Sequence, residues 1–248
     1  MSGGRPTVRL GHLYPDHLNI YADRGNIAVF RRRLEWRGMA LEVAEVGLGD
    51  EMPEDCNLYY LGGGQDRDQW LVAEDLAAKA DSLRRAADSG AVVLAVCGGY
   101  QLMGHSYTAA DGKRMPGTGL LDLETAASRD RLIGDVVLTV DLDGRTSTVV
   151  GYENHAGRTR LGSGCAPLGR VEKGHGNNGE DGFEGAVSGR RIGTYLHGPL
   201  LPKNPWLADV LLRWALDHAG AAVELEPLDD ALEHAAHAVA TKRAGLKR

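Results

Sequence analysis

Residues 91–100 read AVVLAVCGGY, and this stretch decides the fold. Its six apolar residues, 91–96, predict a strand that is buried on both faces, as in a parallel sheet covered by helices. Cys97 follows directly, with small residues after it, and a helical pattern comes next. A strand, a tight turn that carries a nucleophile and a helix together form a nucleophile elbow. Because amides at the start of a helix favour thiolate over thiol, Cys97 is a candidate nucleophile.

Short apolar runs alternate with helical patterns on both sides of this strand. This order is typical of βαβ units, which build a mostly parallel sheet with helices on both faces. We expect further strands at 8–13, 41–46 and 58–61, and helices at 24–37, 67–88, 204–218 and 228–245. The sequence therefore predicts one α/β domain over residues 1–225 and a helical tail over 226–248.

The second half of the chain carries two hairpin signals, Asp143-Gly144 and Gly189-Arg190. Such turn sequences join antiparallel strands. Strand-like segments flank them at 135–140 and 146–152, and at 186–188 and 191–194. We therefore expect a small antiparallel extension of the parallel sheet.

Residues 172–185, EKGHGNNGEDGFEG, are rich in glycine and charge. We expect this segment to be a mobile loop, because it offers little that could pack. Two roles fit a loop of this length: a plain linker, or a segment that orders over a site or a partner.

Composition excludes several classes of protein. The chain has 248 residues, 43% of them hydrophobic, and a net charge of −6. An acidic chain lacks the clustered positive charge of a broad nucleic-acid surface, so we expect no nucleic-acid partner. We interpret the arginines at 31–33 and 37 as a solvated helix face. Since no stretch approaches 18 apolar residues, we expect no membrane span.

Three cysteines, Cys56, Cys97 and Cys165, are too few and too scattered for a disulfide framework. They favour a reducing compartment, so we expect the protein in the cytoplasm. Cys56 and Cys165 lie in no catalytic pattern, and we expect no role for either. The sequence contains neither a Walker A motif nor a GxGxxG after its first strand, so we expect no nucleotide cofactor in this chain.

A thiol nucleophile also needs oxyanion donors and a base. Residues 61–66, LGGGQD, follow an expected strand, and a glycine amide there could supply a second donor beside that of Gly98. Two histidines compete as the base. His197 lies in GTYLHGP, at an expected strand end, and His155 lies in YENHAGR. Spacing favours His197 but leaves His155 open.

Taken together, residues 95–101 and 193–199 resemble the cobyric-acid-synthase-like branch of the class I glutamine amidotransferases. Within that branch the chain is similar to the glutaminase subunits of lipid II isoglutaminyl synthases. The resemblance covers most of residues 10–205. Further matching segments are 12–16, 19–21, 23–27, 62–66, 153–155, 157–159 and 176–179.

The resemblance implies a flavodoxin-like fold and a specific set of site residues. Cys97 would attack the side-chain amide of glutamine to form a thioester, and His197 would act as its base. Amides of Gly64 and Gly98 would hold the oxyanion. The glutamine substrate would be bound by Arg131 or by the alternative Arg129, with Gln101 also in the substrate site.

One departure concerns the group that orients the histidine. Ordinary class I enzymes carry a glutamate two residues after the histidine, where this chain has Pro199. The cobyric-acid branch shares this lack. Asp16, Asp23, Glu153 or an acidic residue of a partner could supply the orienting group, although the position of Asp23 favours a role as N-cap of the first helix.

The resemblance also implies a partner. A Mur-ligase-like (MurT-type) subunit, joined to this chain as a heterodimer, would use ATP and Mg to activate the stem-peptide glutamate of lipid II. Ammonia made at Cys97 would convert that glutamate to isoglutamine. The alternatives are a glutaminase for another amidation such as that of cobyrinate, a non-catalytic ligase scaffold, and a hydrolase of the same fold.

Overall fold

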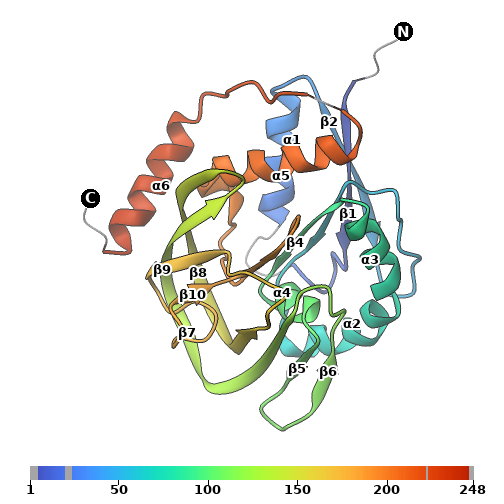
Figure 1. Ribbon diagram of the computed structural model, residues 1–248, viewed down its shortest axis with the longest axis vertical. Coiled ribbons are helices and arrows are strands. Elements are labelled where there is room, and N and C mark those ends of the chain that lie inside the picture. Colours follow the sequence, from blue (N-terminus) through green and yellow to red (C-terminus); the bar gives the residue numbers. More distant parts are fainter. Residues whose placement is uncertain (1–4, 20–23, 222, 246–248) are drawn as a thin grey trace.

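The computed structural model describes residues 5–19, 24–221 and 223–245. Within them the chain forms two six-stranded sheets, flanked by helices (Figure 1). The first sheet is mostly parallel, and the second is mostly antiparallel. The catalytic candidates lie where the two sheets meet.

The first sheet has the strand order of a flavodoxin-like fold. Its order is β11-β12-β4-β3-β1-β2, so the parallel strands follow the order 2-1-3-4-5 with β12 as the fifth. β11 pairs antiparallel at the edge. The expected fold class is therefore confirmed. The strands are β1 (Thr7–Leu13), β2 (Ala40–Val46), β3 (Leu58–Leu61), β4 (Val92–Val96), β11 (Ala186–Ser188) and β12 (Arg191–Thr194).

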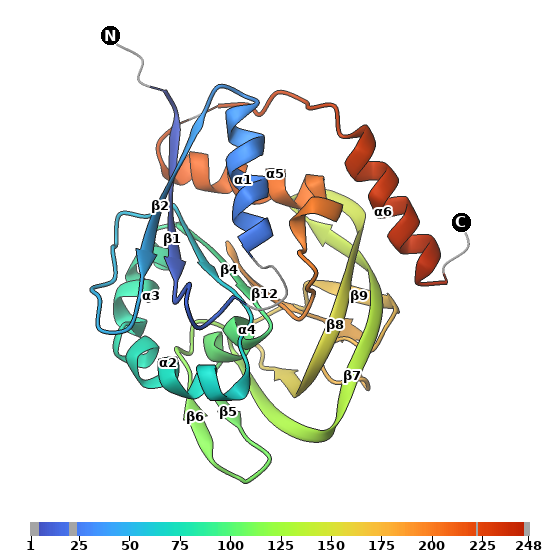
Figure 2. The same cartoon turned by 180° about the vertical axis from the view of Figure 1, so that it is seen from behind.

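Helices cover both faces of this sheet (Figures 1 and 2). α1 (Arg24–Glu35) and α5 (Pro205–His218) pack against each other on one face, and α2 (Asp66–Ala78) and α3 (Ala80–Asp88) lie on the other. α1 forms because its apolar residues recur at helical spacing, and these face the core. The remaining helices are the short α4 (Gly98–Met103), the 3₁₀ turn η1 (Leu201–Lys203) and α6 (Ala231–Arg243).

The single long helix expected at 67–88 is wrong, because the chain breaks it at Lys79. Lys79 has φ −90° and ψ −3°, between α2 and α3. Its ammonium donates to the carbonyl of Gly47 at 3.0 Å and pairs with Asp75. Alanine, lysine and aspartate continue a helical pattern in the sequence, so only this tertiary anchor reveals the break.

The interpretation of the arginine run as a solvated face is wrong for two of its members. Arg31 and Arg32 are exposed, but Arg33 is 2% exposed and lies 2.6 Å from both Asp209 and Asp230. Arg37 pairs with Asp209 as well. The arginines at 33 and 37 therefore join α1 to α5 and to the start of α6.

The antiparallel extension is larger than the sequence predicts. The turn at Asp143-Gly144 is confirmed, with φ 55° and 74°, but its strands run far beyond the expected bounds. The β7–β8 hairpin curves around one side of the molecule (Figure 1). The strands of this sheet are β5 (Ser106–Thr108), β6 (Arg114–Pro116), β7 (Leu123–Leu142), β8 (Arg145–Leu161), β9 (Gly169–Lys173) and β10 (Phe183–Glu184).

The mobile loop expected at 172–185 is also wrong, because this segment is folded and packed. Its ends pair as β9 and β10. Between them Asn177 is fully buried and bonds both the amide and the carbonyl of Gly185, each at 2.9 Å. Asn178 donates to the carbonyl of Thr159 at 3.0 Å. Buried side-chain amides thus fix a segment that has few apolar residues.

The helix expected at 228–245 is α6, which packs along the second sheet (Figure 2). His237 bonds the hydroxyl of Thr148 at 2.8 Å, and Thr241 and Ala244 are buried. The division into a domain over 1–225 and a tail over 226–248 stays a prediction. Across the described parts of the chain, no helix has the length and apolar character needed to span a bilayer.

Candidate active site

Cys97 occupies the turn between β4 and α4 in the conformation of a nucleophile elbow. Its φ is 51° and its ψ is −105°, a region that residues with a side chain rarely adopt. Its N–H donates to the carbonyl of Thr194 on β12 at 2.8 Å. Strain of this kind persists only where surrounding contacts hold it, and it is often found at active sites. The structure therefore places the thiol as the sequence predicts.

The glycines expected to supply oxyanion donors come together. A Cβ on Gly98 would lie 2.9 Å from the amide nitrogen of Gly64. The N–H of Gly99 donates to the carbonyl of Gly62 at 3.1 Å, which ties the elbow to the glycine loop. The absence of side chains at Gly64 and Gly98 is thus a packing requirement. Since Gly98 follows Cys97 in the chain and Gly64 lies close to Gly98, both amides remain candidate donors to an oxyanion at Cys97.

Gln69 braces this loop, a role that the sequence analysis missed. The residue lies in the first turn of α2 and is 2% exposed. Its Nε2 donates to the carbonyl of Gly64 at 3.2 Å and lies 2.7 Å from the position of a Cβ on Gly98. In the sequence, the only hint of this role is that Gln69 lies five residues after Gly64.

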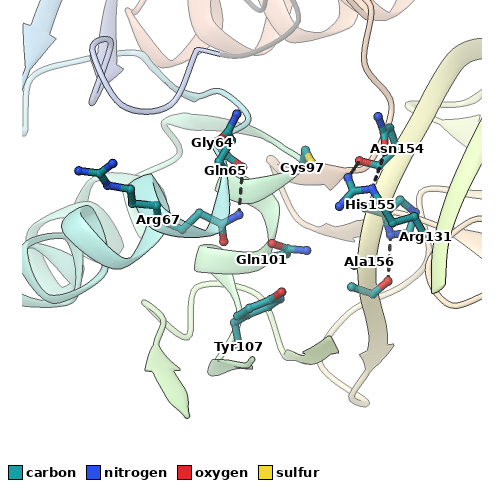
Figure 3. Close-up of a pocket in the computed structure, with 12 residues that line it drawn as sticks. Gly64, Gln65, Arg67, Cys97, Gln101, Tyr107, Arg131, Asn154, His155 and Ala156 are labelled. Atoms are coloured by element: carbon teal, nitrogen blue, oxygen red, sulfur yellow. Dashed lines mark hydrogen bonds between the residues drawn. The ribbon is translucent and has the colours of Figure 1, made fainter. Parts of the chain in front are cut away.

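A pocket of about 490 Å³ opens in front of Cys97 (Figure 3). Two of the predicted substrate-binding residues, Gln101 and Arg131, line it together with Gly64. Asn154 and His155 face Cys97 across the pocket (Figure 3). The full lining is Gly64, Gln65, Arg67, Gln69, Cys97, Gln101, Tyr107, Arg131, Asn154, His155, Ala156 and Gly157.

Arg131 is held in place at the rim of this pocket. Its Nε donates to Oδ1 of Asn154 at 2.9 Å, and its Nη2 donates to the carbonyl of Asn154 at 2.8 Å. Arg129 and Arg131 are both exposed, but only Arg131 lines the pocket. A guanidinium fixed in this way can receive a substrate carboxylate with little loss of side-chain entropy.

His197 lies on the segment that follows β12. Because Thr194 pairs with Val96 in parallel register, His197 and Cys97 follow the carboxyl ends of neighbouring strands. The N–H of His197 donates to the carbonyl of Tyr152 at 2.8 Å, and the residue is 1% exposed. His197 is not among the residues that line the pocket.

His155, the rival base, lines the pocket but is already engaged by polar groups. Its ring stacks on Tyr195 with centroids 3.5 Å apart. Nδ1 donates to the carbonyl of Gly157 at 2.9 Å, and Nε2 lies 3.8 Å from the carboxylate of Glu153. Burial lowers the pKa of His155, although Glu153 opposes the shift. Burial therefore disfavours the charged form of the ring, which forms part of the pocket wall.

The structure distinguishes among the acidic residues of this chain that could orient the His197 imidazole. Asp16 is exposed, and Asp23 lies outside the described residues. Glu153 is fully buried and accepts hydrogen bonds from the amides of His175 and Gly176. Burial disfavours its charge, but the His155 and His175 side chains and these amides outweigh burial and lower the pKa of Glu153.

The other cysteines lie away from this pocket. Cys56 is buried, and burial raises the pKa of its thiol to about 11. Burial also raises the pKa of Cys165. Neither thiol is poised to ionise near neutral pH. Among the residues that the structure describes, no cluster of histidine, cysteine and carboxylate side chains could hold a metal ion.

Comparison with known proteins identifies the family of this chain. The CobB/CobQ-like glutamine amidotransferase domain matches residues 9–205. The lipid II isoglutaminyl synthase (glutamine-hydrolyzing) subunit GatD of Staphylococcus aureus is 39% identical over 96% of this chain and 96% of its own length. The corresponding GatD of Streptococcus pneumoniae is 38% identical over 91% of this chain and 87% of its own.

Solved structures agree on the fold. A chain of PurLQS from Thermotoga maritima has a TM-score of 0.55 at 20% identity, over 86% of this chain and 96% of its own. A glutamine amidotransferase from the same organism has a TM-score of 0.52 at 15% identity, over 96% of this chain and 99% of its own. The chain therefore belongs to the CobB/CobQ-like glutamine amidotransferases and, within that family, to the GatD subunits.

Proposed function

We propose that this chain hydrolyses glutamine and passes the ammonia to a ligase subunit that amidates the stem-peptide glutamate of lipid II to isoglutamine. The single observation that carries this proposal is the elbow: Cys97 at φ 51°, with Gly64 and Gly98 beside it at the mouth of a pocket. Because the chain belongs to the glutamine amidotransferases, we infer that the amide attacked by Cys97 is the side-chain amide of glutamine.

The proposed reaction uses these groups in turn. The Cys97 sulfur attacks the carboxamide carbon of glutamine, and His197 takes the thiol proton. The amides of Gly64 and Gly98 stabilise the charge on the former carbonyl oxygen. The C–N bond then breaks, and ammonia leaves with the proton from His197. Water attacks the resulting γ-glutamyl thioester, which releases glutamate and restores the thiol.

The second half of the reaction belongs to a partner. We infer a Mur-ligase-like (MurT-type) subunit that forms a heterodimer with this chain, binds ATP and Mg, and activates the lipid II glutamate. The GatD relatives are named as subunits of a synthase, which supports a division of labour. A reaction that consumes ATP fits the cytoplasm.

A second function, glutaminase for cobyrinate amidation, is favoured less. The cobyric acid synthase of Pelotomaculum thermopropionicum is 41% identical, but over only 54% of this chain and 28% of its own length. The GatD relatives instead match along nearly the whole chain.

The decisive experiment is to co-purify the chain from its host and to assay ammonia release from glutamine. We expect a Mur-ligase-like protein in the complex, and loss of activity in Cys97→Ala and His197→Ala. Cys165→Ala is the matched control and should leave activity unchanged. A complex that releases no ammonia from glutamine would leave the non-catalytic scaffold as the better explanation. Turnover of other substrates without glutamine would identify a hydrolase.

A further inference from the structure

We propose that Glu184 is a positioning residue, whose buried carboxylate holds the end of β12 that connects Cys97 to His197. This inference rests on the proposed glutaminase function and adds a residue to its machinery. Glu184 touches neither the substrate pocket nor the elbow itself, so it acts through the strand end.

Two hydrogen bonds attach Glu184 to that strand end. Its Oε1 accepts the N–H of Tyr195 at 2.6 Å, and its Oε2 accepts the hydroxyl of Thr194 at 3.0 Å. The hydroxyl oxygen of Thr194 in turn accepts the N–H of Leu196 at 3.1 Å. The carboxylate of Glu184 therefore holds Thr194 and Tyr195 directly, and it holds Leu196 through the hydroxyl of Thr194.

The same segment holds the nucleophile. The carbonyl of Thr194 accepts the N–H of Cys97 at 2.8 Å, and His197 follows Leu196. Displacement of this strand end would thus move both members of the Cys97–His197 pair. Misplacement of reacting groups by about 1 Å can lower the rate about 100-fold. The hydrogen bonds that join Glu184 to residues 194–196, here named the clamp, should therefore affect kcat.

The clamp is itself fixed by the segment 174–185. Asn177 bonds both backbone groups of Gly185, the neighbour of Glu184, and its Oδ1 also accepts the hydroxyl of Tyr100 on α4. These contacts explain why the segment 172–185, although rich in glycine and charge, is packed against residues 194–196. It supports the catalytic strand end.

The ionised form of Glu184 suits this network better than the protonated form. A carboxylate accepts both hydrogen bonds, whereas an acid would donate to Thr194, whose own hydrogen would then lose its acceptor. Among the described residues, the titratable groups that interact electrostatically with Glu184 include Glu153 and Tyr100, and neither is a cation. Burial raises the pKa of Glu184 to about 7. The clamp should therefore weaken as the pH falls below neutral.

The test compares Glu184→Gln with Glu180→Gln in the purified complex. Glu180 is an exposed residue of the same segment. For each variant, kcat and KM for glutamine are measured from about pH 5.5 to about 9. We expect Glu184→Gln to lower kcat about 10- to 100-fold above pH 7, with KM changed less than about twofold. Its kcat profile should also lose the inflection near neutrality, and Glu180→Gln should match the wild type.

Thermal unfolding of each variant separates a kinetic defect from misfolding. If Glu184→Gln does not fold, Glu184→Asp keeps the carboxylate, and it should retain the neutral inflection with a lower kcat. A folded Glu184→Gln with the wild-type kcat profile would overturn the inference while leaving the glutaminase function intact. A wild-type complex without glutaminase activity would overturn the proposed function, and this inference with it.

Discussion

The amide nitrogen of Gly64 lies 2.9 Å from the point that a Cβ on Gly98 would occupy. The two residues belong to different strand ends, Gly64 after β3 and Gly98 after β4. The proposed oxyanion site therefore requires that both strands end at the same edge of the sheet and that neither Gly64 nor Gly98 carries a side chain.

Gly98→Ala should therefore damage catalysis rather than folding alone. A methyl group there would displace the Gly64 amide and the side chain of Gln69, which lies 2.7 Å from the same point. We expect kcat for glutamine to fall at least about 100-fold, as when an oxyanion donor is lost. Gly134→Ala is the matched control, because a Cβ at Gly134 would meet nothing within 4 Å. Wild-type kcat in Gly98→Ala would contradict the assignment of this site.

Arg131→Lys should weaken glutamine binding more than the chemical step. Lysine cannot reproduce the two guanidinium hydrogen bonds to Asn154, at 2.9 and 2.8 Å, that fix Arg131 at the pocket rim. We expect KM for glutamine to rise about tenfold, with a smaller change in kcat. Arg129→Lys serves as the comparison and should leave KM unchanged. A rise in KM in Arg129→Lys alone would transfer the role to that residue.

The elbow was predictable because its signal is local. Six apolar residues followed by Cys97, Gly98 and Gly99 specify a buried strand and a turn that only small neighbours permit. The strands β3 and β4 were equally readable, since each is a short run of hydrophobic residues. Site residues in these segments were therefore within reach of pattern reasoning.

The errors arose where polar side chains do the packing. Asn177 and Glu184 look like loop residues in the sequence, yet both are fully buried, because the fold supplies each with hydrogen-bond partners: Tyr100 and Gly185 for Asn177, and Thr194 and Tyr195 for Glu184. Arg33 likewise reads as solvent-exposed until Asp209 and Asp230 are brought beside it. No periodicity encodes such pairs, since they depend on the tertiary fold.

Arg33→Met should destabilise the fold, because it would leave Asp209 and Asp230 without the cation that both contact at 2.6 Å. Removal of one partner from a buried ion pair commonly costs about 3 kcal/mol or more. We expect a loss of that size in the free energy of unfolding, measured by urea titration. Arg32→Met, on the exposed face of α1, should change this quantity by less than about 0.5 kcal/mol. Equal effects of the two substitutions would contradict the role assigned to the buried arginine.

Glu184 should contribute less to the stability of the folded protein as the pH rises towards neutrality. Its pKa is about 7 in the folded protein, against an ordinary value of 4.5. A raised carboxyl pKa means that the folded state binds the proton more tightly than the unfolded chain does. The stabilisation is thus complete below the ordinary pKa and is lost as the pH rises through 7. The difference in pKa corresponds to at most about 3 kcal/mol.

The free energy of unfolding of Glu184→Gln should vary less between pH 5 and pH 8, by about this amount, than that of the wild type, with Glu180→Gln as the control. If the free energies of unfolding of wild type and Glu184→Gln vary with pH in parallel, the prediction is wrong. Glu184 would then not titrate in this range, and its carboxylate would not destabilise the folded state at neutral pH.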